Sequence, residues 1–262
     1  MAIVTFTTDF GQRDHYVAAM KGIILQIAPK TPLIDVTHQI EPQGVLRAAF
    51  VVRQIWSSFP RGTVHVVVVD PGVGTERRII VAQYAGQTVV CPDNGIVSLL
   101  HRDMPLEMLR TVANRRLFSQ AEPSTTFHGR DIIAPIAGHL SRGIKLTEIG
   151  PPTDQLEILD MLKPERMPDR SVRGEVIYVD GFGNLVTNLT RDDLAHTFVA
   201  LPDAHVWLGD HDVGQIQQTY AQVESGEPLA LVGSVGLLEI AVNSGNAAER
   251  FKADTGIVVT VK

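Results

Sequence analysis

Apolar residues recur at helical spacing in the first half of this chain and in short alternating runs in the second half. The run Val66–Val69 is β-branched throughout, which is typical of a central strand buried on both faces. The pattern before it predicts the order βαβαβ, with strands at 3–8, 33–36 and 64–70 and helices at 14–28 and 43–58. That order predicts a mainly parallel, right-handed α/β sheet, with Asp14 capping or beginning its first helix.

The pattern after the central strand predicts paired strands at 78–83 and 88–91, then helices at 96–100 and 132–140. Four prolines and many charges follow within 151–173, where few long-range contacts are expected. We therefore predict an α/β domain at 1–160, a linker at 161–173 and an all-β domain at 174–262. Short strands indicate a small antiparallel barrel or sandwich in this last part, at 176–179, 185–187, 205–208, 228–232, 237–242 and 257–261.

Composition narrows the class of protein. The 262 residues carry a net charge of −6, so no global attraction to nucleic acid or to an anionic membrane is expected. Cys91 is the single cysteine, which excludes intrachain disulfides and fits a reducing compartment. No apolar stretch reaches membrane-spanning length, and the amino terminus enters a strand pattern at once. A cytoplasmic protein is expected.

Polar residues cluster where predicted strands end. Asp70 ends the central strand and precedes a glycine-rich turn that leads to Arg77 and Arg78. Ligands bind at the carboxyl ends of strands in an open α/β sheet. A lone Asp-Pro-Gly is more often a structural turn, but a similar polar cluster ends the first predicted strand at 7–11, and a polar turn recurs at 124–131 before a predicted helix. Together they indicate a site at the edge of the sheet.

Several familiar site classes are missing from the sequence. It contains no phosphate-binding Gly-x-x-x-x-Gly-Lys-Ser/Thr or Gly-x-Gly-x-x-Gly motif and no Gly-x-Ser-x-Gly nucleophile motif. Cys91 has no base beside it in the sequence and is predicted to be part of the core. A metal held by Asp9, Asp70, His128 and Asp131 is an alternative on residue type, but no metal-ligand spacing supports it.

Six motifs taken in order resemble the S-adenosylmethionine hydroxide adenosyltransferases, hydrolytic relatives of the fluorinase and chlorinase enzymes. They are Thr8–Gly11, Asp70–Gly74, Pro92–Gly95, Thr126–Asp131, Asp180–Asn184 and Gly236–Asn243. The resemblance implies an α/β domain followed by a β-barrel, and a homotrimer with active sites between subunits. It also implies that water or hydroxide displaces L-methionine from C5′ of S-adenosylmethionine and leaves adenosine, with no metal and no organic cofactor.

The resemblance assigns water activation to Asp70, Arg77 and His128. An imidazole is suited to proton transfer near neutral pH, a carboxylate orients it or the water, and a guanidinium holds the carboxylate ionised. Which of the three takes the proton is left open.

The resemblance also assigns the substrate contacts. Asp9 matches the carboxylate that accepts both ribose hydroxyls, Phe127 and Phe182 match aromatic contacts to the nucleoside, and Asn184 matches the amide that reads the adenine edge. Positions that bind the methionine ammonium and carboxylate correspond to Asp14, Asp180 and Ser234. Two further positions in the last motif, Val242 and Asn243, complete the predicted substrate-binding set.

Differences from the halogenating relatives favour hydrolysis. Those enzymes have a tyrosine at the position of Asp70 and a halide-binding serine at that of Gly129, and a carboxylate repels a halide but tolerates water. Tyr16 and Val235 also differ from the halogenases, so the methionine anchor is expected to differ. The alternatives are a halide-dependent, chlorinase-like adenosyltransferase, a non-catalytic S-adenosylmethionine- or adenosine-binding protein, and a metal-dependent hydrolase.

Overall fold

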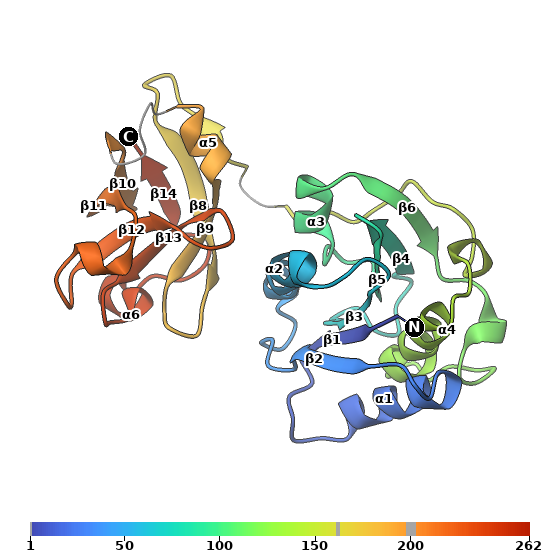
Figure 1. Cartoon of the computed structure of the whole chain (residues 1–262). Helices are drawn as coiled ribbons and strands as arrows, with labels where there is room; N and C mark the ends of the chain where they lie inside the picture. The colour runs from blue at the N-terminus through green and yellow to red at the C-terminus, as the bar shows by residue number, and fades with distance from the viewer. Residues whose placement is uncertain (1, 161–162, 198–202) are drawn as a thin grey trace. The chain divides into compact units, whose positions relative to one another are not determined.

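The chain forms two compact units, Met1–Leu159 and Asp160–Lys262. The computed structural model describes residues 2–160, 163–197 and 203–262 (Figure 1). Residues 161–162 of the predicted linker lie outside the described residues. The later part of that linker range contains the short strand β7 (Glu165–Arg166) and the start of β8.

The first unit is built on a six-stranded mixed sheet in the order β2-β1-β3-β5-β4-β6. Its strands are β1 (Val4–Thr8), β2 (Leu33–Thr37), β3 (Val64–Val68), β4 (Ile79–Tyr84), β5 (Gln87–Pro92) and β6 (Leu106–Thr111). The pairs β1–β2, β1–β3 and β3–β5 are parallel, whereas β4 runs antiparallel to β5 and β6. The predicted α/β class with a mainly parallel sheet is confirmed.

Helices cover both faces of this sheet. Its α-helices are α1 (Tyr16–Ile27), α2 (Val45–Ile55), α3 (Ser98–Asp103) and α4 (Ala134–Ser141). Single turns are formed by 56–58, 115–117, 129–133 and 146–148. Val66 and Val68 pack in one core cluster with residues of α1 and α4, while Val67 and Val69 pack in another with residues of α2. Alternate residues of the central strand thus reach opposite faces, as the apolar run predicts.

Helix ends differ from the sequence prediction. Asp14 does not cap α1, because His15 occupies the N-cap position and makes no side-chain cap hydrogen bond. The helix predicted from residue 43 begins at Val45, since Gln43 has a φ of +67° and Gly44 is the N-cap. A π-helical turn at Gly129–Ile133 precedes α4. These ends depend on local backbone geometry that the apolar spacing does not determine.

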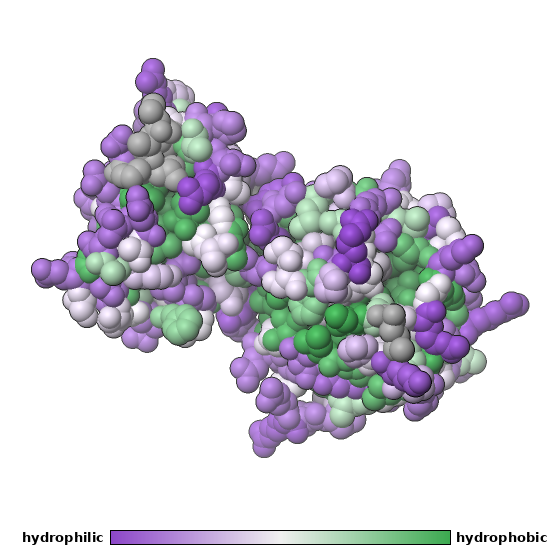
Figure 2. Space-filling view, viewed as in Figure 1, coloured by the Kyte–Doolittle hydropathy of each residue, from purple (hydrophilic) through white to green (hydrophobic). Residues whose placement is uncertain are grey.

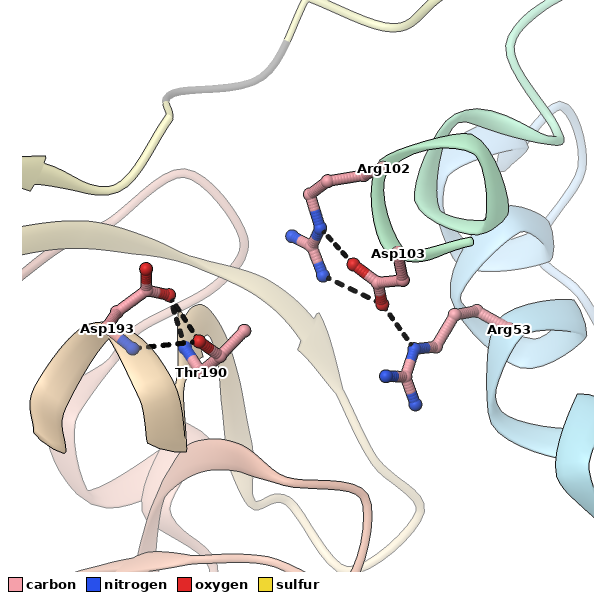
Figure 3. Close-up of polar contacts among 5 residues, drawn as sticks. All are labelled: Arg53, Arg102, Asp103, Thr190 and Asp193. Atoms are coloured by element: carbon pink, nitrogen blue, oxygen red, sulfur yellow. Dashed lines mark hydrogen bonds and ion pairs between the residues drawn. The ribbon is translucent and has the colours of Figure 1, made fainter. Parts of the chain in front are cut away.

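Charged side chains join α2 to α3 in the first unit. Arg53 at the end of α2 donates from Nε to Asp103 Oδ2 over 2.7 Å, and Arg102 donates to Asp103 Oδ1 over 2.6 Å (Figure 3). Burial of this carboxylate acts to raise its pKa, but the hydrogen bonds from the two guanidinium groups outweigh burial and lower it. The contact fixes the ends of the two helices together.

The second unit is a closed β-barrel of seven strands. They are β8 (Val172–Val179), β9 (Leu185–Thr190), β10 (His205–Leu208), β11 (His211–Gln217), β12 (Pro228–Val232), β13 (Leu237–Val242) and β14 (Val258–Val261). The order is β14-β10-β11-β12-β13-β9-β8, and the pairing of β14 with β8 closes the ring. The predicted barrel is confirmed, but the polar strand β11 was not expected, and its parallel pairing with β12 departs from the antiparallel arrangement predicted.

Short helical segments lie in three of the connections between the barrel strands. These are α5 (Arg191–Ala195), the turn at 220–222 and α6 (Ala247–Phe251). Thr190 and Asp193 cap α5 reciprocally: the Thr190 hydroxyl accepts from Asp193 N over 3.1 Å, and Asp193 Oδ2 accepts from Thr190 N over 2.8 Å (Figure 3). Among the described residues, no helix is long and apolar enough to cross a membrane. Figure 2 shows polar side chains over much of the viewed surface of each unit.

Candidate active site

Three predicted residues meet at the carboxyl end of β3. Arg77 donates from Nε to Asp70 Oδ1 over 2.8 Å, and its Nη2 forms an ion pair with Asp70 Oδ2. The same Nη2 donates to His128 Nδ1 over 2.9 Å. The side chains of Arg77 and Asp70 are only 10% and 5% exposed. One guanidinium therefore joins a buried carboxylate to an imidazole from a segment 51 residues away.

A tight turn brings Arg77 back to Asp70. Thr75 donates from its hydroxyl to the Gly72 carbonyl over 2.7 Å, and Val73 N donates to the Asp70 carbonyl over 3.3 Å. Gly74 has a φ of +82°, and a Cβ there would lie 2.6 Å from the Thr125 carbonyl oxygen. Only glycine allows the turn to approach the segment before His128 this closely.

The surroundings of His128 favour its neutral form. Burial lowers the pKa of the imidazole, the positive charge of Arg77 lowers it further, and Asp70 and Asp131 act in the opposite direction. Because a guanidinium only donates hydrogen bonds, Nδ1 of His128 accepts, and the proton of the neutral ring lies on Nε2. Protonation at Nδ1 would put two donors face to face.

A cavity of about 450 Å³ opens beside these groups in the first unit. Asp70 and His128 line it together with Asp9, Phe127 and Gly129, and so do Phe10, Tyr16, Pro42, Gln43, Val68, Pro71, Val73 and Thr126. The ring of Phe127 meets those of Phe10 and Tyr16 edge-on, with centroids 5.9 and 5.2 Å apart. The cavity thus combines an aromatic wall with two carboxylates, which suits a ligand with apolar and hydroxyl-bearing parts.

Gln43 is a site residue that the sequence analysis missed. Its backbone N–H donates to Asp9 Oδ2 over 3.1 Å, which orients the carboxylate at the cavity. The strained φ of +67° at Gln43 makes this contact possible. No apolar pattern marks such a turn, so the only sequence signal was the Pro-Gln-Gly tripeptide before the helix.

Two other acidic residues of the first unit do not line the cavity. Asp14 is exposed just before α1 and does not line the cavity. Asp131 is fully buried; burial acts to raise its pKa, but its bonds to Arg130 and Ser124 N outweigh burial and lower the pKa to about 2. In the described part of the chain no group of three or more His, Cys, Asp and Glu side chains is placed to hold a metal.

The second unit holds the remaining predicted residues, three of them in the β8–β9 turn. Asp180 accepts from Phe182 N over 2.8 Å, from Asn184 N over 2.9 Å and from Asn184 Nδ2 over 2.9 Å. The carboxylate therefore shapes its own turn. That turn buries Asn184 and leaves Phe182 80% exposed, an unusual position for a phenylalanine with only a structural role.

The β12–β13 hairpin and the turn after it hold the last three predicted residues, Ser234, Val242 and Asn243. Ser234 lies in the hairpin turn, whereas Val242 is packed in the barrel core. Asn243 donates from Nδ2 to the Val223 carbonyl over 2.8 Å. Glu239 of β13, which the sequence analysis did not select, is buried and accepts from the Tyr220 hydroxyl over 2.6 Å. Burial raises the pKa of Glu239, the hydrogen bond from Tyr220 acts to lower it, and the negative charge of Asp180 raises it further.

The chain is similar to known proteins along almost its whole length. Residues 4–150 match the SAM hydroxide adenosyltransferase N-terminal domain, and residues 174–260 match the C-terminal domain of the same family. An (R)-S-adenosyl-L-methionine hydrolase of Thermus thermophilus is 36% identical over 99% of both chains. A fluorinase of an Actinoplanes species is 27% identical over 99% of this chain and 97% of its own. A crystal structure of a conserved Thermotoga maritima protein superposes with a TM-score of 0.92, at 38% identity over 99% of both chains.

Proposed function

The chain belongs to the SAM hydroxide adenosyltransferase family, and we propose that it hydrolyses S-adenosyl-L-methionine to adenosine and L-methionine. The observation that carries the proposal is the Asp70–Arg77–His128 contact at the edge of the cavity. Relatives at 31–36% identity are named (R)-S-adenosyl-L-methionine hydrolases, so the (R) configuration at sulfur belongs to the proposed substrate.

The reaction is an in-line displacement. A water oxygen forms a bond to C5′ while the C5′–S bond breaks and its electron pair stays on sulfur as a neutral thioether. No acid is needed at this leaving group, so catalysis consists of holding the water in line, removing its proton and excluding other solvent.

Asp70 is the proposed proton acceptor among the three residues. Its carboxylate lines the cavity and retains acceptor capacity beyond the two bonds from Arg77, because a carboxylate has about four lone-pair sites. In the neutral His128, Nδ1 is occupied by Arg77, and the Nε2–H group is left to orient the water. Arg77 holds both groups through its hydrogen bonds.

The substrate contacts follow the same proposal. Asp9 accepts the ribose hydroxyls with the oxygen capacity that Gln43 N leaves free, and Phe127 packs on the sugar. Phe182 and Asn184 recognise adenine. Asp14, Asp180 and Ser234 bind the amino-acid end. Val242 at the end of β13 and Asn243 directly after it shape the site.

Further features of the proposal come from the family resemblance. The enzyme acts as a cytoplasmic homotrimer with active sites at subunit interfaces, and it needs no metal or organic cofactor. Light scattering on a size-exclusion column tests the trimer, and activity after dialysis against a chelator tests the metal.

The decisive experiment is product analysis. The purified protein is incubated separately with the (R) and (S) sulfonium epimers, with chelator and without halide, and the products are separated. Equal amounts of adenosine and methionine establish hydrolysis at C5′, and the faster epimer identifies the substrate. Turnover that requires chloride and gives 5′-chloroadenosine would show the halogenating alternative. Binding without turnover of either epimer would show a binding protein.

A further inference from the structure

Asp93 and Asn94 contact both ends of the turn that runs from Asp70 to Arg77. Asn94 donates from Nδ2 to the carbonyl of Val69, the residue before Asp70, over 2.9 Å. Asp93 forms an ion pair with Arg78, the residue after Arg77, and Asp93 N donates to the Arg78 carbonyl over 2.9 Å. The segment between Asp70 and Arg77 therefore begins and ends on neighbouring residues of the turn after β5.

The Asp93 side chain is only 1% exposed, and its second oxygen is also engaged. Glu157 N donates to Asp93 Oδ1 over 3.0 Å. Arg78 in turn donates from Nη1 to Gln155 Oε1 over 3.1 Å and from Nη2 to the Gln155 carbonyl over 3.2 Å. Because a buried carboxylate with several partners has little freedom to move, Asp93 is a fixed point for the end of the turn.

Arg77 pairs with Asp70 while the next residue, Arg78, pairs with Asp93, so the two ion pairs share one short stretch of backbone. A shift of Arg78 would carry Arg77 with it, and a shift of Val69 would carry Asp70. The distance between Asp70 and Arg77 therefore depends on the positions of both Val69 and Arg78.

We propose that Asp93 and Asn94 are positioning residues for the hydrolytic reaction: together they hold Asp70 and Arg77 in register, and so keep Arg77 on Nδ1 of His128. This inference rests on the proposed function only for the kinetic measurement, because the pKa of His128 is measured without substrate. Neither residue lines the cavity beside His128, so each acts through the turn between Asp70 and Arg77.

The variant Asn94→Ala tests this without changing any charge. The charged groups that act on His128 are Arg77, Asp70 and Asp131, and Asp131 is paired with Arg130. Since alanine adds or removes no charge, a shift in the His128 pKa must come from movement of these groups. Loss of Arg77 from Nδ1 removes a cause that lowers the pKa, so the pKa is expected to rise, by about 0.5 unit or more.

The pKa is measured by NMR on protein labelled with ¹⁵N-histidine and free of substrate, with the His128 signal assigned from a His128→Gln spectrum. The matched control is Asn114→Ala, because Asn114 Nδ2 also donates to a backbone carbonyl, that of Glu148, over 2.8 Å. The control should lose a similar amount of thermal stability and leave the His128 pKa unchanged.

Kinetics provide the second readout. Asn94→Ala is expected to lower kcat roughly tenfold with KM within about threefold, and to move the acid limb of kcat/KM to higher pH. Asp93→Asn keeps the size of the side chain but removes the charge that holds Arg78, and a loss of kcat in the same direction is expected. A folded Asn94→Ala protein with the wild-type His128 pKa and kcat would overturn the proposal. Wild-type protein that turns over neither epimer would overturn the proposed function instead, and the NMR result would still decide whether Asn94 positions Arg77.

Discussion

The guanidinium of Arg77 binds the carboxylate of Asp70 through two of its nitrogens, Nε to Oδ1 and Nη2 to Oδ2. This fork geometry fixes the plane of Arg77, and the same Nη2 then reaches His128. The pair is buried, so each member depends on the other for its charge to be tolerated. The orientation of the whole candidate catalytic group therefore follows from one bidentate ion pair.

Replacing Arg77 by lysine should show whether the reaction needs only the positive charge of Arg77 or also the shape of its guanidinium. A lysine ammonium keeps the positive charge but cannot serve both carboxylate oxygens and His128 in one plane. We expect Arg77→Lys to lower kcat on S-adenosylmethionine by about 100-fold with little change in KM. Steady-state kinetics check this, with the exposed Arg116→Lys as control. Equal loss of substrate affinity would contradict an orienting role.

Stability should show that Asp70 and Arg77 depend on each other. Asp70→Ala leaves a buried guanidinium without its partner, and a cost of about 3 kcal/mol in the free energy of unfolding is expected. The double variant Asp70→Ala/Arg77→Ala should lose less than the sum of the two single variants, because it leaves no isolated charge. Urea unfolding of the four proteins measures the coupling. Additive losses would mean that the pair contributes nothing beyond its separate side chains.

The pH profile should reflect the lowered pKa of His128. Burial first, and Arg77 second, keep this pKa below the usual 6.5, so the imidazole stays neutral as the pH falls through 6.5. We expect kcat/KM to remain level from neutral pH to below 6.5 and to fall only when Nδ1 becomes protonated and repels Arg77. A pH series of kcat/KM tests this. An acid limb at or above 6.5 would contradict it.

His65 should make the stability of the first unit depend on pH. It is buried in β3 between Thr5 and Gln87, and burial lowers its pKa from 6.5 to about 4. The unfolded chain therefore binds a proton that the folded chain does not, and stability is lost as the pH falls from 6.5 to 4. The expected loss is about 3 kcal/mol.

Unfolding by urea at several pH values measures the His65 effect. His65→Phe, which keeps a ring against Trp56, should flatten the dependence between pH 6.5 and 4, whatever its own stability. The carboxyl of Asp131, with a pKa of about 2, stabilises the fold above its usual pKa of 3.8 and loses this effect only at lower pH, so it does not obscure the window. An unchanged slope in His65→Phe would assign the effect to another group.

Phe182 should matter for substrate and not for folding. The residue is 80% exposed, so Phe182→Ala is expected to change the free energy of unfolding by less than about 0.5 kcal/mol. If the ring stacks on adenine, KM should rise roughly tenfold, which corresponds to the roughly 1–2 kcal/mol typical of base stacking. Kinetics with Ile257→Ala, which also shortens an exposed apolar side chain of the second unit, provide the control. An unchanged KM in Phe182→Ala would remove Phe182 from the substrate site.

The apolar pattern alone predicted most elements of the fold, because buried apolar residues recur at the spacing of a helix or a strand. The run Val66–Val69 is a central strand with two buried faces, as predicted. The strand β11 was missed because most of its residues are polar and several are exposed. Only Val213 and Ile216 reach the barrel core, and β11 is otherwise held by backbone pairing with β10 and β12. Backbone pairing leaves no signal in residue type.

The sequence predicts only part of the chemistry of the candidate site. Strand-end polar turns pointed to Asp70 and His128, and the resemblance pointed to Arg77, but the contact among them joins segments 51 residues apart. The directions of Arg77 toward Asp70 and of Arg78 toward Asp93 were decided by the tertiary structure. Residue types and spacing determine which side chains are available and which segments are buried, because these depend on local composition. Which charges face each other depends on how distant segments pack, and only the folded chain determines that.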